Sequence, residues 1–520
     1  MITKTVDIKF DDVAIMLNPI VDQVAVAKKD IEAGVRVFFR EDVIEVKAPI
    51  KKGHRFAVVD IDQGEYVKQG GHAFGRSRGI LKGEAISLVN IDNVIPETNL
   101  ENFSAPARTI YQERFLNQTF LGYVRKNGSV GTRNFYLIVP TSMCSSQTAL
   151  QVASTLENDQ TIFQKYPSLD GIVSIPHTEG CGCDATVSID RLLRILEGYI
   201  RHPNVGGCLV IDLGCEQTNY GKVESYIKQT ILENLKPIDW LTIEESGGVD
   251  ATRHKAEEII THRLPEVADI KRELCPLEKL VVGTNCGASD SFSAITANPL
   301  IGNVVDKVVW GKGSAILSEI PELVGTFEMF LPRFRSIEVA GKFRQAIQWY
   351  ENLAQRLGMT LEANLVPKNK EGGLLNNYVK SLGGALKGGR TAIEDVIDYG
   401  ESIKKTGLNI MQGPGGDLES VTGIVSCGAN IMCFSTGKGT PTGNAICPVV
   451  KITSTDEVFK KLSNDMDFNG GRLLTDQISV DELGDELLNF VKDVASGKRT
   501  AAERLKQRQF QVWTAGKLSL

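Results

Sequence analysis

The segment Phe135–Cys144, FYLIVPTSMC, decides the fold of this 520-residue chain. Its continuous apolar run predicts a short buried strand, and its hydroxyl-rich end predicts a turn into the next element. From Leu121 onward, similar runs alternate with longer amphipathic segments, as in SQTALQVASTLEN, GIVSIPH, IDRLLRILEGYI, GCLVIDLG and VESYIKQTILENL. This βαβ rhythm predicts a mostly parallel sheet covered by helices.

The rhythm begins again near residue 275 with KLVVGTN and continues to the segment VDELGDELLNFVKDVAS. Before residue 100, by contrast, short strand-like runs are separated by turn signals such as EAG, KKG, DQG and KGE, about ten residues apart. We therefore predict an α/β fold with a small N-terminal all-β domain (1–100), a linker (101–120) and two α/β catalytic domains with mostly parallel sheets (121–272 and 273–520).

The composition is typical of a globular protein, with 42% apolar and 23% charged residues and a net charge of −6. No basic stripe indicates nucleic-acid binding, and no run reaches the 18 or so apolar residues that a membrane span needs. The N-terminal segment is charged and has no apolar signal region. We expect a cytoplasmic protein that binds neither nucleic acid nor membrane, with its ten cysteines free or ligating.

Four cysteines stand where predicted strands end. Cys144 closes FYLIVPTSMC, Cys181 lies in PHTEGCGCD, Cys215 follows CLVIDLG and Cys286 follows KLVVGTN. Ligands of α/β folds bind outside the carboxyl ends of the strands, so we expect these thiols to converge on one site for a soft or borderline metal ion. The alternative interpretation is four thiols that pack as small apolar side chains.

A histidine and acids accompany these thiols. His177 and Asp184 flank Cys181, and Glu216 directly follows Cys215. Imidazole, thiolate and carboxylate groups ligate iron, zinc or manganese, or transfer protons. The alternative is a packed turn. No C-x₂-C pair is present, which argues against a structural zinc site.

Two further segments carry polar groups after predicted strands. NCGASDSFSAITANP (285–299) suits a polyhydroxylated or anionic ligand, and its Asp290 could meet a metal ion; the alternative is a cap for a helix that starts near Ser291. Glu319 and Glu322 in SEIPELVG could bind a cation or act as a general base, or could belong to a solvated loop.

Two loops contain glycine, lysine and hydroxyl groups. ANLVPKNKEGG (363–373) and STGKGTPTG (435–443) offer backbone N–H groups, Lys370 and Lys438 to a carboxylate or phosphate. Neither loop fits the P-loop pattern G-x-x-x-x-G-K-[ST]. The chain also has no G-x-G-x-x-G after its first strand and no G-x-S-x-G, so neither a dinucleotide cofactor nor a serine-hydrolase elbow is supported.

Taken together, these motifs resemble the altronate dehydratase/galactarate dehydratase family of sugar-acid hydro-lyases. The matching segments run in order along nearly the whole chain: GYVRKNGSVGTRN, PTSMC, HTEGC, RHPN, VIDLGCE, CGASD with TANP, SEIPE, NKEGG, KSLGG and STGKGTPTG. The N-terminal segment, with GHRFAVVDI (53–61), resembles the small β-clip-like SAF domain of that family. HTEGC, RHPN and SEIPE resemble the altronate form more closely than the galactarate form.

The resemblance implies dehydration of a sugar acid, an altronate-type aldonate, to a 2-keto-3-deoxy acid with the help of a divalent metal ion, Fe²⁺ or Mn²⁺. It implies catalytic roles for His177, Glu319 and Lys370. It implies substrate contacts from His54, Arg133, Asn134, Ser289, Asn298, Thr436, Gly437 and Thr440. It implies metal ligands among Cys144, Cys181, Cys215, Glu216, Cys286 and Asp290.

One departure from the family pattern bears on the substrate. Family members carry a basic residue followed by Tyr-Gly where this chain has Gln69–Gly71. Galactarate, or another 2-hydroxy acid such as a sulfonated acid, therefore stays open as an alternative substrate.

The cysteines could also hold an iron–sulfur cluster in place of a single ion. A catalytically silent sugar-acid binding protein is a third alternative, and we expect a homo-oligomer.

Overall fold

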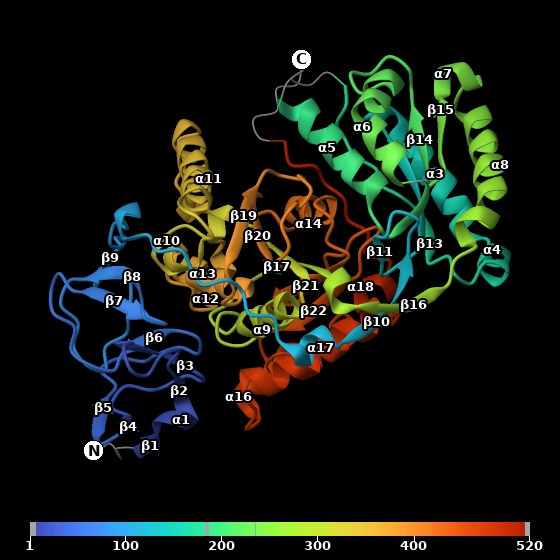
Figure 1. Cartoon of the computed structure of the whole chain (residues 1–520). Coiled ribbons are helices and arrows are strands. Elements are labelled where there is room, and N and C mark those ends of the chain that lie inside the picture. The colour runs from blue at the N-terminus through green and yellow to red at the C-terminus, as the bar shows by residue number, and fades with distance from the viewer. Residues whose placement is uncertain (1–6, 182–186, 235, 515–520) are drawn as a thin grey trace.

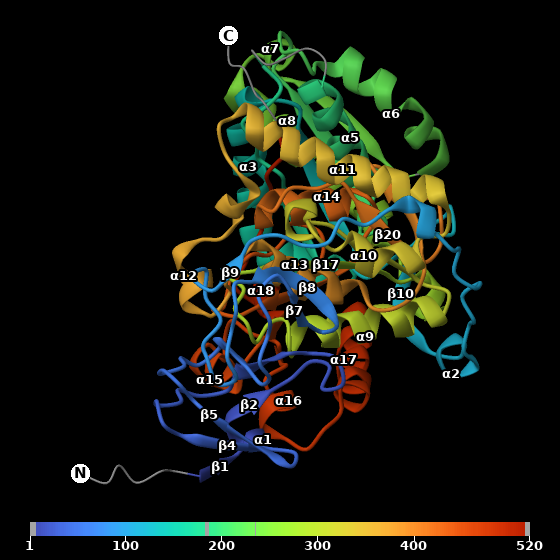
Figure 2. The same cartoon turned by 90° about the vertical axis from the view of Figure 1, so that its left-hand side faces the viewer.

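The computed structural model describes residues 7–181, 187–234 and 236–514. Figure 1 shows a small strand-rich domain at one end, an α/β domain at the other, and the C-terminal part of the chain between them. Figure 2, turned by 90°, shows the same order. The predicted class, α/β with a small N-terminal β domain, is confirmed.

The small domain consists of three three-stranded sheets, ordered β1-β4-β5, β2-β3-β6 and β7-β8-β9. Its strands are β1 (Asp7–Lys9), β2 (Ala14–Ile15), β3 (Val24–Ala27), β4 (Arg36–Phe39), β5 (Asp42–Glu45), β6 (Arg55–Ala57), β7 (Tyr66–Gln69), β8 (His72–Ser77) and β9 (Ile91–Asp92). A single turn of helix, α1 (Phe10–Val13), separates the first two strands.

The Gln69–Gly71 segment, which departs from the family pattern, lies in a β-hairpin. Gln69 pairs with His72 across the β7–β8 turn, and the two turn residues, Gly70 and Gly71, have φ of 61° and 82°. Two consecutive positive φ values are characteristic of the tight turn that joins twisted antiparallel strands, and glycine adopts them without strain. The sequence analysis did not predict this hairpin.

The second domain contains a parallel sheet of order β13-β12-β14-β15. Its strands are β12 (Phe135–Pro140), β13 (Gly171–Ser174), β14 (Val205–Asp212) and β15 (Ile238–Thr242). Its helices are α3 (Met143–Asn158), α4 (Gln160–Lys165), α5 (Val187–Arg201), α6 (Tyr220–Asn234), α7 (Ile243–Ser246) and α8 (Val249–Ala268).

The apolar run that opens this domain is buried on both faces. Tyr136 and Ile138 of β12 enter a core shared with α3 and α8. Leu137 and Val139, which point the other way, enter the core shared with α5 and α6. A central parallel strand with helices on both faces has no solvent-facing side, which is why the segment is apolar without alternation.

The C-terminal domain is built on a seven-stranded, all-parallel sheet of order β19-β20-β18-β17-β21-β22-β23. Its strands are β17 (Val281–Gly287), β18 (Ser314–Leu317), β19 (Ile393–Ile397), β20 (Leu408–Met411), β21 (Ile431–Thr436), β22 (Val449–Thr453) and β23 (Phe468–Asn469). Its main helices are α9 (Ala297–Trp310), α11 (Ile337–Arg356), α12 (Pro367–Glu371), α13 (Asn377–Ala385), α14 (Asp417–Ser426), α17 (Val480–Ala495) and α18 (Ala501–Arg504).

The two α/β domains share one continuous hydrophobic core. A small antiparallel sheet, β11-β10-β16, connects them through β10 (Thr119–Val124), β11 (Val130–Gly131) and β16 (Arg272–Pro276), so β10 starts inside the predicted linker. Within the described residues, none of the helices combines the length and apolar character that crossing a bilayer requires.

A buried ion pair also joins these domains. Arg133 is 1% exposed and donates to both carboxylate oxygens of Glu503 at 2.6 and 2.9 Å, and also to the carbonyls of Val494 and Lys498. Asn134 beside it donates to the carbonyls of Ser168 and Val267 and accepts from Arg125. The polar groups of Arg133 and Asn134, both predicted as substrate contacts, are therefore bonded to other groups of the protein.

We expect Arg133→Met to destabilise the protein by about 3–5 kcal/mol, because it leaves the Glu503 carboxylate buried without its partner. Urea unfolding followed by circular dichroism measures this loss. Lys51→Met, which removes one half of the exposed Lys51–Asp30 pair, is the control and should unfold like the wild type. An Arg133→Met protein as stable as the wild type would contradict the assignment.

Candidate active site

Three ligand-type side chains meet at the carboxyl edge of the seven-stranded sheet. Cys286 lies near the end of β17, while Glu319 and Glu322 follow the end of neighbouring β18. All three are buried, and one ligand atom from each lies within 4.8 Å of the others. The Cys286 thiol donates to Glu322 Oε2 at 3.1 Å, and the Cys286 N–H donates to Glu319 Oε2 at 3.1 Å.

Two buried lysines neutralise the carboxylates of this cluster. Lys387 Nζ donates to Cys286 Sγ at 2.8 Å and forms an ion pair with Glu319 Oε2. Lys380 Nζ, from α13, pairs with Glu322 Oε1 at 2.7 Å and donates to the side-chain and backbone oxygens of Asn364. Each carboxylate therefore has an ammonium partner, which is the condition for keeping charges away from water.

Glu319 combines three unusual properties. Its φ of 67° is left-handed, a conformation that costs energy in a residue other than glycine. Its Oε1 is buried and has no hydrogen-bond partner among the described residues. Burial raises the pKa of its carboxyl group to about 8, against the attraction of Lys387. Strain, an unmet acceptor and a raised pKa at one residue are typical of a proton-transfer group.

The pKa of the neighbouring Glu322 is shifted in the opposite direction. Burial alone would raise its pKa, but the charges of Lys380 and Lys387 hold the pKa below its ordinary value. Two carboxyl groups with opposite pKa shifts in one cluster can divide the work, since one can carry a proton while the other stays ionised.

A second layer of charge surrounds the cluster. Asp417 starts α14, and burial, with the nearby charge of Glu322, raises its pKa to about 6. Lys451 of β22 lies with Nζ 3.7 Å from the centre of the Phe434 ring, and burial lowers its pKa to about 7. Its Nζ is also without a hydrogen-bond partner among the described residues.

The donor set fits a divalent transition metal. One thiol and two carboxylates are a ligand set that suits Fe²⁺ or Mn²⁺. A thiolate on Cys286 would add a negative charge to the two carboxylates that Lys380 and Lys387 already pair with, so a bound cation is electrostatically compatible with the cluster. Cys286 stays a candidate ligand in this structure, and Glu322, which the sequence analysis gave as a possible cation ligand, lies beside it.

The loops over this edge contain most of the predicted substrate residues. Asp290 accepts from the backbone and hydroxyl of Ser293 and from the hydroxyl of Ser454. A Cβ on Gly437 would lie 2.6 Å from Asp290 Cγ, so glycine is required there for the two loops to meet. Asp290 thus holds the loops together and is not among the clustered ligand atoms.

The remaining predicted residues of this edge have defined places. Thr436 Oγ1 accepts from the N–H groups of Gly439 and Thr440 at 2.9 Å, which closes the 436–440 turn. Asn298 accepts from Ser435 and is buried with it. Further predicted residues are Ser289, which is buried, and Lys370, which is exposed on α12.

The small domain contributes an arginine that the sequence interpretation missed. Arg55 is 2% exposed, donates to Ser291 Oγ at 3.2 Å and to the Gly373 carbonyl at 2.6 Å, and contacts Gln69 through Nε. Its Nη2 has no hydrogen-bond partner among the described residues, and burial lowers its pKa to about 9. The signal was present, since Arg55 interrupts the otherwise apolar strand of GHRFAVVDI.

His54, predicted as a substrate contact, lies at the same interface. It is half-buried, and this burial lowers its pKa, while a hydrogen bond to the backbone of Glu371 opposes the shift. His54 and Arg55 together bring the small domain onto the loops that cover the cluster.

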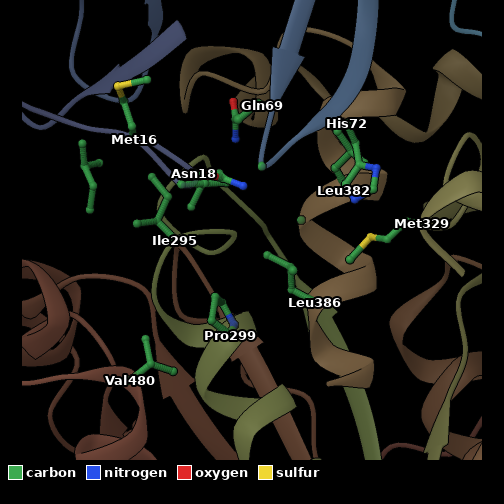
Figure 3. Close-up of a pocket in the computed structure, with 14 residues that line it drawn as sticks. Met16, Asn18, Gln69, His72, Ile295, Pro299, Met329, Leu382, Leu386 and Val480 are labelled. Carbon is green, nitrogen blue, oxygen red and sulfur yellow. The ribbon is translucent and has the colours of Figure 1, made fainter. Parts of the chain in front are cut away.

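A cavity of about 440 Å³ lies between the small domain and the C-terminal domain (Figure 3). Asn18, Gln69 and His72 are its polar side chains. The rest of its wall is mostly apolar, with Met16, Leu382 and other residues drawn in the figure. Such a wall does not suit a polyhydroxylated acid, so we place the candidate active site at the charged cluster.

The other three predicted cysteines lie in the second domain. Cys144, Cys181 and Cys215 follow β12, β13 and β14 of the four-stranded sheet, so the four thiols expected at one site are divided between two sheets. His177 is buried there, with Nε2 2.9 Å from the Pro140 carbonyl and Nδ1 accepting from the Glu179 N–H. The predicted Asp184 falls outside the described residues.

Comparison with known proteins matches all three parts of the chain. Residues 12–94 match "Altronate/galactarate dehydratase SAF domain", residues 122–268 match "D-galactarate dehydratase/Altronate hydrolase, second domain", and residues 277–518 match "D-galactarate/Altronate dehydratase, C-terminal".

Full-length relatives agree with these matches. An altronate dehydratase of Bacillus subtilis (strain 168) is 31% identical over 496 residues, 95% of this chain and 97% of the relative. The galactarate dehydratase (L-threo-forming) of Escherichia coli (strain K12) is 32% identical over 92% of each chain. The (2R)-sulfolactate sulfo-lyase subunit beta of Chromohalobacter salexigens is 31% identical over 76% of this chain and 96% of the relative.

We expect Lys387→Met to destabilise the protein by about 3–5 kcal/mol, because Glu319 loses its buried partner. The double variant Lys387→Met/Glu319→Gln removes both charges and should recover much of this loss. Urea unfolding of both single variants and the double variant yields the coupling energy. Strictly additive losses would contradict a direct Lys387–Glu319 interaction.

Proposed function

Because this chain belongs to the altronate/galactarate dehydratase family, we propose that it dehydrates an altronate-type aldonate to a 2-keto-3-deoxy acid with the help of Fe²⁺ or Mn²⁺. The observation that carries this proposal is the buried Cys286–Glu319–Glu322 cluster at the carboxyl edge of a parallel sheet. Below, "the cluster" means these three residues with Lys380 and Lys387.

The reaction removes a weakly acidic proton from the carbon beside a carboxylate and expels the hydroxyl of the next carbon. Glu319 is our candidate base, since Oε1 is free to accept a proton and the pKa of its carboxyl group is raised to about 8. Lys387 holds the other oxygen, Oε2, so it fixes which oxygen faces the substrate. The proton is thus received at a defined atom in a site without bulk water.

Cys286 and Glu322 would hold the divalent ion. When bound, such an ion polarises the carboxylate and 2-hydroxyl oxygens of the substrate and stabilises the negative charge that develops there. Lys380 keeps Glu322 ionised and therefore able to ligate.

Arg55 is our candidate for the far end of the substrate. The buried Arg55 guanidinium has one N–H group without a partner and no salt bridge to a described residue. A substrate anion or hydroxyl that accepts from this N–H would therefore stabilise it. Since the cluster is fully buried, we infer that the small domain moves to admit substrate and then closes over it through Arg55 and His54.

Galactarate or a sulfonated 2-hydroxy acid is the second candidate substrate. The observation that favours it is the same Arg55, because a planar guanidinium pairs well with a second carboxylate or a sulfonate. The relatives named as a galactarate dehydratase and a sulfolactate sulfo-lyase act on such diacids.

Anaerobic turnover with Fe²⁺, Mn²⁺ or Mg²⁺ tests the function against D-altronate, galactarate and sulfolactate. We expect 2-keto-3-deoxy acid from D-altronate only with Fe²⁺ or Mn²⁺, and a loss of about 10²–10⁴ in kcat for Glu319→Gln. Glu351→Gln, which alters a half-buried glutamate of α11, is the matched control and should keep normal turnover. Metal-loaded protein that turns over none of the sugar acids would refute the proposal.

Arg55→Met separates substrate binding from packing. If Arg55 binds the substrate, KM should rise at least about tenfold. Circular dichroism checks that the variant, which also loses the hydrogen bonds to Ser291 and Gly373, stays folded. Arg55→Lys should recover part of the affinity. Unchanged KM in Arg55→Met, measured with the substrate found in the screen, would give Arg55 a purely structural role.

A further inference from the structure

The three cysteine-bearing loops of the second domain are hydrogen-bonded to one another directly beside each cysteine. The bonds join the loops after β12, β13 and β14 in pairs: Met143 N–H to the Glu179 carbonyl (2.8 Å), Gln217 N–H to the Gly180 carbonyl (3.0 Å) and Thr218 Oγ1 to the Thr141 carbonyl (2.6 Å). Cys144, at the start of α3, Cys181 and Cys215 are therefore each within three residues of these contacts, and they follow strands that end at one edge of the sheet.

Glu216 braces the same loops from inside. Its buried carboxylate accepts from the hydroxyls of Thr141 and Ser142 and from the N–H groups of Leu213 and Gly214, at 2.7–3.0 Å. Because its carboxylate already accepts four hydrogen bonds, Glu216 holds the loops in place and is not available as a metal ligand. Gly180 has a φ of 95°, and a Cβ there would lie 2.6 Å from the Thr141 carbonyl oxygen, so only glycine allows this approach.

The thiols of Cys144, Cys181 and Cys215 are free and accessible. Cys144 and Cys215 are exposed, Cys181 is partly exposed, and none forms a disulfide. Burial and the negative charges of Cys181, Glu216 and Cys215 raise the pKa of Cys144, so these groups lie within electrostatic reach of one another. A bound cationic group stabilises neighbouring thiolates together.

The spacing of the sulfur atoms indicates which group. A single tetrahedral ion with metal–sulfur bonds of about 2.3 Å would place its thiolates about 3.8 Å apart. The three sulfurs are not all within 4.8 Å of one another, because the one set of described residues that meets this limit is Cys286, Glu319 and Glu322. At least one pair of these sulfurs is therefore more than 4.8 Å apart, which suits a polynuclear centre in which each cysteine ligates a different iron.

We propose that Cys144, Cys181 and Cys215 bind a [4Fe–4S] cluster, each through one iron. The fourth iron then has no cysteine ligand among these three and faces the exposed side of the loops, where an oxygen ligand can reach it. This centre is separate from the Cys286 site and adds an oxygen-sensitive metal requirement to the hydro-lyase. The oxygen-sensitive requirement of the hydro-lyase rests on the proposed function. Binding of the iron–sulfur cluster does not, because it is argued from the three cysteine-bearing segments alone.

The test uses the full chain, reconstituted without oxygen with an iron salt, sulfide and dithiothreitol. We expect about four iron and four acid-labile sulfide per chain, a broad visible absorption band and an electron paramagnetic resonance signal on reduction. Cys144→Ser, Cys181→Ser and Cys215→Ser should each lose the iron, the sulfide and the band. Cys208→Ala, which removes a buried thiol from the same strand β14, should retain them and serves as the control for folding.

Uptake of one iron or zinc without sulfide by the wild type would overturn the proposal, as would equal sulfide content in the wild type and the three serine variants. Cys286→Ser separates the two sites, since it should keep the chromophore and lose sugar-acid turnover. A chromophore without turnover in the wild type would contradict the proposed function alone, and turnover without iron-bound sulfide would contradict the cluster alone.

Discussion

The buried ammonium of Lys387 is the interaction on which the active-site account depends. Taking a carboxylate or an ammonium out of water costs several kcal/mol per ion unless the two meet with good geometry. Lys387 contacts both Cys286 and Glu319, so one cation compensates a thiol and a carboxylate at the same point. Without it, Glu319 would sit in a strained backbone conformation with an uncompensated charge.

Parallel topology brings these groups together. Cys286 and Glu319 come from adjacent strands of one sheet, and parallel strands end at the same edge. The small domain closes this edge through glycines: Gly53 has a φ of 84°, and a Cβ on Gly373 would lie 2.1 Å from the Gly53 carbonyl oxygen. This close backbone contact is what allows Arg55 to reach Ser291.

The sequence predicted the architecture well because a continuous apolar run indicates a strand that is buried on both faces of its sheet. FYLIVPTSMC and KLVVGTN form central parallel strands, and GIVSIPH forms a parallel strand at the edge of the four-stranded sheet. The β7–β8 hairpin escaped prediction because its strands are short and contain Lys68, His72 and Arg76, whose polarity hides the pattern.

The site was predictable only in part. Cys286 and Glu319 stand at strand ends, so their placement follows from topology. Lys380 and Lys387 lie on and just after helix α13, and nothing in KSLGGALKGG indicates that both point into the core. The division of the four cysteines between two sheets also could not be predicted, because equivalent strand ends in successive βαβ units look alike in sequence.

A crystal structure of the Glu319→Gln variant with bound D-altronate, prepared without oxygen, tests most directly where the substrate binds. We expect the sugar acid at the carboxyl edge of the seven-stranded sheet, with its second carbon beside residue 319 and its far end toward Arg55. Sugar acid bound only at the Cys144–Cys181–Cys215 edge of the second domain, with none beside residue 319, would contradict this expectation.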